Sequence, residues 1–379
     1  LWQIEFIVPH VWSCDMAFLN RPAAYKVWIF APYLHTEDPT LKYYYDYTQS
    51  IAEYTKVFSE LDCEWEWVNV TIHNIQESIE KVKKHKRKKN IVLNLCDGDE
   101  INEVPGISVI HALDASNLTY TGSDSHFYNV TTSKITMKEA FHEHGVSMPG
   151  WAKLNGHIDP DLFKKVGKPI IVKPAVSAGS MGISVKNVVT GKRQLKSVLD
   201  TLHSGFKGWK LDGAGLLAEQ FIIGREFTTF LVGSYEKPEQ IKFYRPIERV
   251  FHESLPEKEQ FLSFERLWEA YEEEKPLPEN SFLYEYEPVT CPDLAARLQE
   301  LSIDAFKAVK GRGYARLDIR MDKKTQQLFV LEINAQCGLS EDENYTSIGA
   351  ILRVSNKTFT DLIVEVLDDA LLRKSKARP

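Results

Sequence analysis

The sequence predicts a mixed α/β protein of two or three domains that begins with a parallel β-sheet. Strand-like and helix-like segments alternate up to Cys96, a pattern typical of parallel strands joined by helices. The length of 379 residues exceeds what a single hydrophobic core usually serves. Near the C-terminal end, two runs of alternating apolar and polar residues flank a polar turn over residues 314–334, which predicts a β-hairpin.

The individual elements follow from the spacing of apolar residues. In the first part of the chain we expect strands at 25–31, 65–70 and 91–96 and helices at 41–61 and 75–84. Further on we expect strands at 169–174, 183–189, 216–223 and 226–232 and helices at 134–144, 192–202, 293–310 and 359–372. Residues 235–290 are charged, aromatic and interrupted by prolines, which indicates long strands with a mobile excursion between them.

Composition and charge exclude several classes of protein. A net charge of −7 argues against a nucleic-acid binder, and the basic run at 81–89 is interpreted as the solvated end of a helix. The five cysteines are scattered, which predicts reduced thiols rather than zinc sites. No apolar run reaches the roughly 18 residues that a membrane span needs, so we expect a cytoplasmic protein.

The hairpin carries polar side chains that we expect to meet on one face. They are Arg316 and Asp318 in the first strand and Glu332 and Asn334 in the second. The predicted alternation puts three apolar residues of the second strand together on the opposite face: Phe329, Leu331 and Ile333. Two carboxylates and an amide oxygen suit Mg²⁺, and an arginine beside them suits a phosphate or an oxyanion. The alternative is a solvated hairpin face with an incidental salt bridge.

Three further segments carry chemistry. Lys173 precedes a loop of small residues, 175–182, whose backbone N–H groups could cradle phosphate, although a plain turn is an equal alternative. Glu219 and Gln220 lie in a predicted buried strand, and Glu226 follows it. This arrangement could bind the adenine and ribose of a nucleotide; the alternative is a strand end capped by polar groups. The loop at 97–106 follows the third strand, and parallel sheets bind ligands at the carboxyl ends of their strands. The alternative is that this loop is an acidic surface turn.

Taken in order, these segments resemble the ATP-grasp enzymes, and within them the D-alanine–D-alanine ligase branch. The resemblance covers roughly residues 94–352 and is strongest at 171–183, 217–227 and 313–338. It implies an α/β ATP-grasp fold of three domains. These are an N-terminal substrate domain, a central ATP-grasp subdomain and a C-terminal catalytic and metal-binding subdomain, at 1–122, 123–220 and 221–379.

The resemblance implies a role for each matched residue. Lys134 and Lys173 would contact the ATP phosphates beneath a loop that contains Gly179 and Ser180. The adenine edge would be formed by Glu219, Gln220, Phe221 and Ile222, with Glu226 on the ribose. The metal ligands for two Mg²⁺ ions, with Mn²⁺ as the alternative ion, would be Asp318, Glu332 and Asn334. The catalytic residues would be Arg316, which stabilises the oxyanion of the tetrahedral intermediate, together with Lys173 and Ser180.

The substrate-binding part departs from the family pattern. The acidic loop after the first strand is replaced by residues 32–39, which contain Glu37, and the HGxxGEDG segment is replaced by 94–100, which contain Asp97. Leu267 and Trp268 stand where the family has lysine and tyrosine, and Arg266 is expected to restore the lost charge.

Beyond Gly338, which matches a family glycine, Glu341 and Glu343 replace small hydroxyl residues. We expect this acidic stretch to repel a free carboxylate, so that the amine substrate carries an extra cation or lacks a carboxylate.

The expected function is that of an ATP- and Mg²⁺-dependent carboxylate–amine ligase that works through an acyl phosphate. Its partners would be a small acid and a small amine, amino-acid-like but different from two D-alanines, and family members are often homodimers. One alternative is a kinase on the same scaffold that phosphorylates a hydroxyl group. Another is a nucleotide-binding regulatory protein without catalysis.

Overall fold

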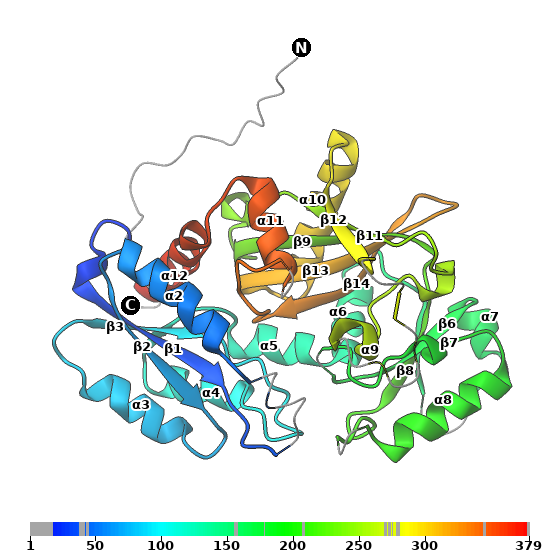
Figure 1. The fold of residues 1–379 in the computed structure, drawn as a ribbon, viewed down its shortest axis with the longest axis horizontal. Helices are drawn as coiled ribbons and strands as arrows, with labels where there is room; N and C mark the ends of the chain where they lie inside the picture. The colour runs from blue at the N-terminus through cyan, green and yellow to red at the C-terminus, as the bar shows by residue number, and fades with distance from the viewer. Residues whose placement is uncertain are drawn as a thin grey trace, which may run out of the picture.

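A computed structural model describes residues 18–376 except for several short stretches (Figure 1). The exceptions are 38–41, 43–44, 155–157, 178, 207–208, 269–270, 272–273, 275, 278–280 and 344–345. Cys14 therefore lies outside the described residues. The same holds for the first residues of the predicted helix at 41–61 and for parts of the segments at 32–39 and 175–182. No helix in the described part of the chain is long and apolar enough to cross a membrane.

The N-terminal sheet is parallel, as predicted. Its strand order is β2-β1-β3-β4, with β1 at Tyr25–Pro32, β2 at Glu64–Val70, β3 at Lys89–Asn94 and β4 at Thr119–Tyr120. The helices of this part are α2 (Thr48–Glu60), α3 (Ile75–Lys84) and α4 (Ile107–Ala115). The predicted helix at 41–61 is shorter than expected. The Asp46 side chain accepts hydrogen bonds from the Thr48 backbone N–H and hydroxyl, at 3.0 and 2.6 Å, and the helix begins there.

A small antiparallel sheet follows, with the order β5-β8-β6-β7. Its strands are β5 (Trp151–Leu154), β6 (Ile170–Pro174), β7 (Val188–Val189) and β8 (Leu216–Gln220), packed against helices α7 (Leu162–Val166) and α8 (Lys192–Ser204). The predicted strand at 183–189 is wrong in its first part. Ser184 and Asn187 form a capping box around a 3₁₀ turn at Val185–Asn187, which leaves only two residues for the strand.

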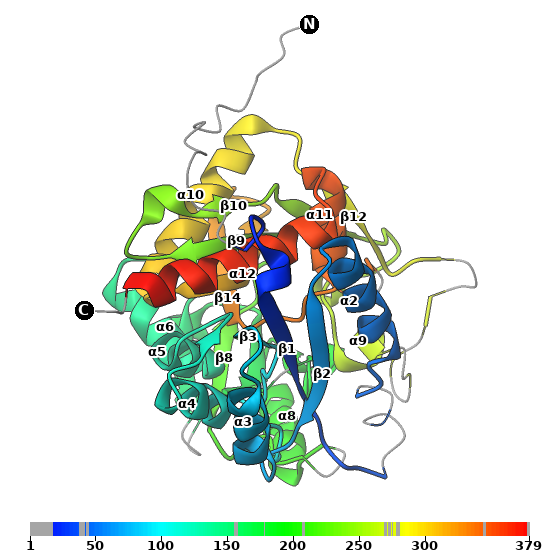
Figure 2. The same ribbon diagram turned by 90° about the vertical axis from the view of Figure 1, so that its left-hand side faces the viewer.

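The large sheet is antiparallel, with the order β12-β11-β9-β13-β14 and the short β10 beside β9. Its strands are β9 (Gly224–Ser234), β10 (Lys242–Phe243), β11 (Ile247–Phe251), β12 (Tyr284–Pro288), β13 (Arg312–Asp322) and β14 (Leu328–Ala335). One core of the sheet is shared with α5 (Ser125–Thr132), α6 (Lys134–Glu143) and α10 (Pro292–Ala308). A second core is shared with α11 (Ser347–Ser355), α12 (Phe359–Lys376) and the N-terminal sheet. Figure 2 shows α12 lying across the large sheet next to β1.

The prediction of long strands at 235–290 is wrong. The described residues of this stretch form three short strands, two 3₁₀ turns at Pro238–Gln240 and Glu257–Glu259, and a single-turn helix α9 at Phe264–Trp268. Two of its prolines, Pro238 and Pro256, stand at the start of these turns, and proline cannot donate to a strand ladder. The three sheets fall within the three predicted domain ranges, whose boundaries stay a prediction.

The hairpin forms, but its second strand alternates differently from the prediction. The register pairs Asp318 with Glu332 and Ile319 with Val330, so Leu331 is an extra residue in a β-bulge. The side-chain alternation therefore changes phase, and the residues packed into the core are Leu328, Val330 and Ile333. The four predicted polar residues still share one face, because the bulge lies beyond their two paired positions.

Candidate active site

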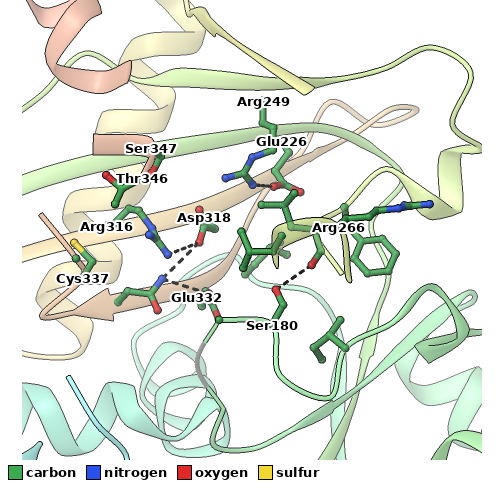
Figure 3. Close-up of a pocket in the computed structure, with 18 of the residues that line it drawn as sticks. Ser180, Glu226, Arg249, Arg266, Arg316, Asp318, Glu332, Cys337, Thr346 and Ser347 are labelled. Carbon is green, nitrogen blue, oxygen red and sulfur yellow. Dashed lines mark hydrogen bonds and ion pairs between the residues drawn. The ribbon is translucent and has the colours of Figure 1, made fainter. Parts of the chain in front are cut away.

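A cavity of 1380 Å³ lies where the three sheets meet. Pro32 and Leu95 line it from the N-terminal sheet, Lys173 from the small sheet, and Asp318 and Glu332 from the large sheet. Figure 3 shows several of its lining side chains pointing toward one another from different elements. The fold therefore brings segments that are far apart in sequence to one site.

The polar face of the hairpin forms one wall of this cavity. Asp318 lies directly opposite Glu332, and Arg316 lies opposite Asn334. The Asn334 amide nitrogen is 3.5 Å from Asp318 Oδ2 and 3.3 Å from Glu332 Oε1, and Arg316 Nη2 is 3.5 Å from Asp318 Oδ2. The structure thus brings together all four residues that the sequence predicts to converge here.

The two carboxylates differ in their surroundings. Burial raises the pKa of Asp318, and Arg316 lowers it without cancelling the rise. Burial also acts to raise the pKa of Glu332, but Lys134, Lys173 and Arg316 bring that pKa down to about 2. Like charges directly opposite on neighbouring strands destabilise a sheet, and a divalent cation between them would relieve the repulsion.

The donor set fits Mg²⁺. Among the described residues no group of three or more His, Cys, Asp or Glu side chains could hold a metal ion. The predicted set has only two carboxylates, and its third member is the amide of Asn334. An Mg²⁺ site of this kind takes few carboxylates and completes its shell with water and substrate phosphates.

Three lysines of the small sheet and α6 form ion pairs with Glu332 and Glu219. Lys134 Nζ lies 3.7 Å from Glu332 Oε2 and donates to the Ser177 carbonyl oxygen at 3.1 Å. Lys173 Nζ lies 3.0 Å from Glu219 Oε1, and Lys138 Nζ lies 2.5 Å from Glu219 Oε2. Lys138 is 0% exposed and was not among the predicted site residues; its i+4 spacing from Lys134 was the available signal.

Glu219 gives a prediction about stability and pH. Burial raises its pKa, but Lys138 and Lys173 lower it further, so the net pKa lies below the ordinary value. Such a group stabilises the fold above its unfolded pKa of about 4.3 and loses that contribution as the pH falls toward its folded pKa. The difference in unfolding free energy between wild type and Glu219→Gln should therefore be largest near neutral pH and shrink below about pH 4.3. Denaturant unfolding of both proteins across this pH range measures it, and a difference that stays constant would contradict the assignment.

The loop of small residues is held beneath the segment 261–268, which we call the covering segment. Gly179 and Ser180 have positive φ angles of 54° and 58°. The Ser180 hydroxyl donates to the Leu262 carbonyl oxygen at 3.0 Å, and the Trp268 indole donates to the Gly179 carbonyl oxygen at 2.9 Å. Both loop residues line the cavity, and Trp268, at a position where the family has tyrosine, fastens the covering segment to the loop.

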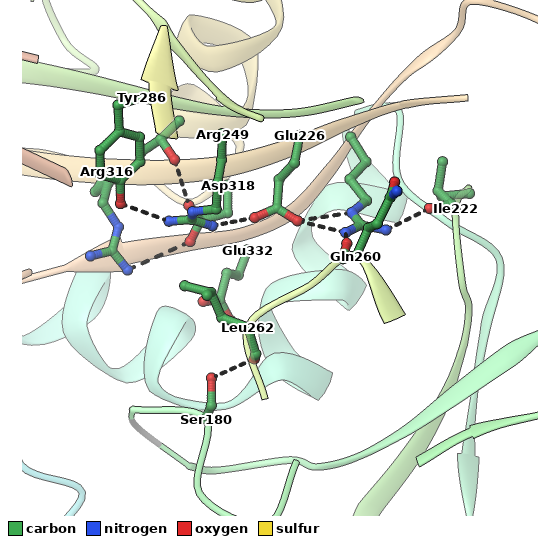
Figure 4. Close-up of polar contacts among 12 residues, drawn as sticks. Ser180, Ile222, Glu226, Arg249, Gln260, Leu262, Tyr286, Arg316, Asp318 and Glu332 are labelled. Atoms are coloured by element: carbon green, nitrogen blue, oxygen red, sulfur yellow. Dashed lines mark hydrogen bonds and ion pairs between the residues drawn. The ribbon is translucent and has the colours of Figure 1, made fainter. Parts of the chain in front are cut away.

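Glu226 lies in the cavity wall between two arginines (Figure 4). Arg249 donates to its Oε1, and Arg320 donates to its Oε2 from Nε and Nη2, at 2.9 and 2.8 Å. Arg320 also donates to the Ile222 carbonyl oxygen at 2.8 Å. The residues predicted for the adenine edge also line the cavity: Glu219, Gln220, Phe221 and Ile222. Arg249 could not be predicted from the sequence, because only strand pairing across β9 and β11 brings it to Glu226.

Arg266 does not supply the charge expected of it. Its guanidinium lines the cavity, but it pairs with Glu259 Oε2 at 2.8 Å and with Glu274 Oε2 at 3.1 Å. The side chain is only 5% exposed. Two carboxylates therefore neutralise it, and it stabilises the covering segment rather than replacing the family's lysine.

Two residues predicted to bind substrate, Glu37 and Asp97, differ in whether they lie at the cavity. Glu37 is not at the site: its side chain is 96% exposed and pairs with Lys42 at 2.6 Å. Asp97 lines the cavity, as does Gly338. Burial raises the pKa of Asp97 to about 6.

Two of the three acidic residues that follow Gly338 have basic partners, which the prediction of a repulsive surface did not include. Glu341 pairs with Lys56 at 3.1 Å, and Glu343 pairs with Arg353 at 2.6 Å. Glu341 and Glu343 are therefore balanced by basic partners, while Asp342, between them, lines the cavity. Three small hydroxyl residues also line this end of the cavity: Ser340, Thr346 and Ser347. The repulsion expected from Glu341 and Glu343 is thereby reduced.

Comparison with known proteins gives a consistent result. The family model for the D-ala D-ala ligase C-terminus matches residues 144–368. A D-alanine–D-alanine ligase of Xanthomonas axonopodis pv. citri is 28% identical over 288 residues, which cover 74% of this chain and 78% of that protein. The uncharacterized protein y4sG of Sinorhizobium fredii is 28% identical over 293 residues, which cover 75% of each chain.

The fold also has a solved counterpart. The crystal structure of D-alanine–D-alanine ligase from Bacillus anthracis complexed with ATP superposes with a TM-score of 0.65 at 18% identity. The match covers 93% of this chain and 99% of that one, so the architecture is the ATP-grasp fold. Because the family model spans more than half of the sequence, the chain belongs to the D-alanine–D-alanine ligase family of ATP-dependent ligases.

Proposed function

We propose that the protein is an ADP-forming ligase that joins a carboxylic acid to an amine through an acyl phosphate. The observation that carries this proposal is the arrangement around the hairpin. Lys134 and Lys173 approach Glu332 from one side, and Arg316 lies beside Asp318 on the other. This arrangement provides positive charge for phosphate groups and a separate arginine for an oxyanion within one cavity.

The reaction would proceed in two steps. A carboxylate oxygen of the acid attacks the γ-phosphorus of ATP, the bond to the bridging oxygen breaks, and ADP leaves. The nitrogen of the amine then attacks the acyl carbon, phosphate leaves, and the nitrogen loses a proton. Lys134 and Lys173 would hold the phosphate oxygens during the first step, which depends mainly on positioning and charge neutralisation. Asp318, Glu332 and Asn334 would hold Mg²⁺, which when bound neutralises phosphate charge.

We also propose that the substrates are small and amino-acid-like but differ from two D-alanines. The first strand contributes its last residue, Pro32, to the cavity, while Glu37, the only acidic residue in the described residues 32–37, faces solvent. Two carboxylates that line the cavity, those of Asp97 and Asp99, follow the third strand instead. An ammonium group on the acid substrate would therefore be bound by residues after the third strand, rather than by residues after the first strand. An amine substrate with a free carboxylate is compatible with the paired charges of Glu341 and Glu343.

A phosphate-release screen of acids crossed with amines tests the proposed function. It should include amino acids of both hands, each supplied with ATP and Mg²⁺. ADP and phosphate are expected only when a matching acid and amine are both present. Steady ATP turnover that requires neither compound would contradict a ligase.

Arg316 should be needed for the second step. Replacing Arg316 with methionine removes the cation beside the acyl carbon, and loss of one oxyanion donor lowers kcat by about 10²–10³-fold in other enzymes. We expect a loss of this size in amide formation, measured with the pair of substrates from the screen. Arg316→Lys should recover part of the rate, because it keeps the charge but not the planar fork. Full activity of Arg316→Met would exclude this role.

A further inference from the structure

The wall of the cavity around Glu226 carries more positive than negative charge. Strand pairing places Arg249 on β11 and Arg320 on β13 on either side of Glu226 on β9. Glu226 is 5% exposed, Arg249 9% and Arg320 2%. One carboxylate thus faces two guanidinium groups, and the next carboxylate along the wall, that of Asp318, already lies 3.5 Å from Arg316.

The two arginines differ in how many of their nitrogen atoms have partners. All three guanidinium nitrogens of Arg320 donate, to Glu226 and to the carbonyl oxygens of Ile222 and Gln260. Arg249 donates from Nη1 to Glu226 and from Nη2 to the Tyr286 hydroxyl at 3.2 Å. Its Nε is buried and has no hydrogen-bond partner. A buried donor without a partner costs free energy, so a ligand that accepts from it is favoured.

Arg249 is also held in place for a ligand. Its guanidinium lies 5.1 Å from the ring of Tyr284 and 5.5 Å from the ring of Tyr286, and it lines the cavity. Figure 4 shows Arg249 linked to Glu226, and the carboxylates of Glu226 and of the metal-ligand candidate Asp318 both act on its charge. The aromatic contacts restrain the plane of the guanidinium, which reduces the entropy lost when it binds an anion.

Other arginines of the cavity are less available. Arg266 is neutralised by Glu259 and Glu274, and Arg353 makes a two-point pair with Glu343. Arg316 lies on the far side of Asp318, where we place the oxyanion. Arg249 is therefore the cation on the Glu226 side of Asp318 that keeps a donor for a phosphate.

We propose that Arg249 binds the phosphoryl group that is transferred, donating to an oxygen of the γ-phosphate of ATP. This role rests on the proposed function, since it requires ATP to lie along this wall with its terminal phosphate near Asp318. Arg249 would then supply the positive charge that was expected from a lysine at position 267, where this chain has leucine. Arg266 does not supply this charge.

Comparing ATP with ADP tests this role. Calorimetric titration of the full-length protein with each nucleotide in Mg²⁺ would be run for wild type, Arg249→Met and Arg249→Lys. A charge-assisted hydrogen bond to the γ-phosphate predicts that Arg249→Met weakens ATP binding about 10–100-fold while ADP binding changes about twofold or less. Arg249→Lys should retain part of the preference for ATP.

A matched control lies on the same two strands. Arg225 pairs with Glu248 across β9 and β11, lies outside the cavity lining and is 48% exposed. Arg225→Met should leave the ratio of ATP to ADP affinity unchanged. Melting curves of all variants show whether they are folded, and if Arg249→Met does not fold, the test rests on Arg249→Lys.

Three outcomes would overturn the inference. An equal loss of ATP and ADP affinity in the Arg249 variants means that the arginine acts only by holding Glu226. An unchanged nucleotide preference with a raised KM for the acid means that it binds the carboxylate of the acid instead. An unchanged preference together with an unchanged KM means that it binds neither group. Wild-type protein that binds no ATP would refute the proposed function itself, and this result is separate from the comparison among variants.

Discussion

Replacing Glu332 with glutamine should lower the rate of ATP turnover by about 10³-fold. The substitution keeps the size of the side chain but removes a charge that is fully present at neutral pH, because the pKa of Glu332 is about 2. Asp318 would lose the carboxylate paired opposite it, and Lys134 would lose its ion-pair partner. An ADP-release assay with the matching acid and amine measures the effect.

Glu287→Gln is a suitable control for this experiment. Glu287 is an exposed residue of β12 that does not line the cavity. Its variant should turn over ATP at the wild-type rate and melt at the wild-type temperature. If Glu332→Gln also retains most of its turnover, the polar face of the hairpin is not the metal-binding wall.

Replacing Glu226 with glutamine should destabilise the protein by about 3–5 kcal/mol. The change leaves two buried guanidinium groups, those of Arg249 and Arg320, without the carboxylate between them. Removing one partner of a buried ion pair leaves the remaining charge desolvated, which is more costly than the loss of an exposed pair. Denaturant unfolding of wild type and variant gives this difference directly.

The comparison for Glu226 is an exposed pair of similar chemistry. Glu257 is 52% exposed and pairs with Lys323 at 2.6 Å. Glu257→Gln should change the unfolding free energy by at most about 1 kcal/mol. Equal effects for the two substitutions would show that the Glu226 cluster adds no more stability than a surface pair.

The sequence predicts the parts of this fold that depend on local pattern. Strands β1, β2 and β3 and helix α3 follow from hydrophobic spacing, and α3 has the predicted bounds of Ile75–Lys84, whereas the two-residue β4 was not predicted. The bulge at Leu331 was not predictable in this way, because it is visible only in the pairing of β13 with β14. The short turns within 235–290 were missed because prolines and charges indicate interruption without fixing how the chain folds between interruptions.

The candidate site shows the same division. The convergence of Arg316, Asp318, Glu332 and Asn334 could be predicted because these residues lie in one hairpin. The charge at Glu341 was overestimated because its partner is Lys56, 285 residues away in the chain. The partners of a charged side chain, and hence its effective charge, are set by tertiary contacts that no local pattern contains.

The most direct test of the central claim is trapping of the acyl phosphate with hydroxylamine. The protein would be incubated with ATP, Mg²⁺, the acid identified in the screen and hydroxylamine in place of the amine. The account predicts an acyl hydroxamate formed in equal amount to ADP. A stable phosphoester without any hydroxamate would contradict it and indicate phosphoryl transfer to a hydroxyl group.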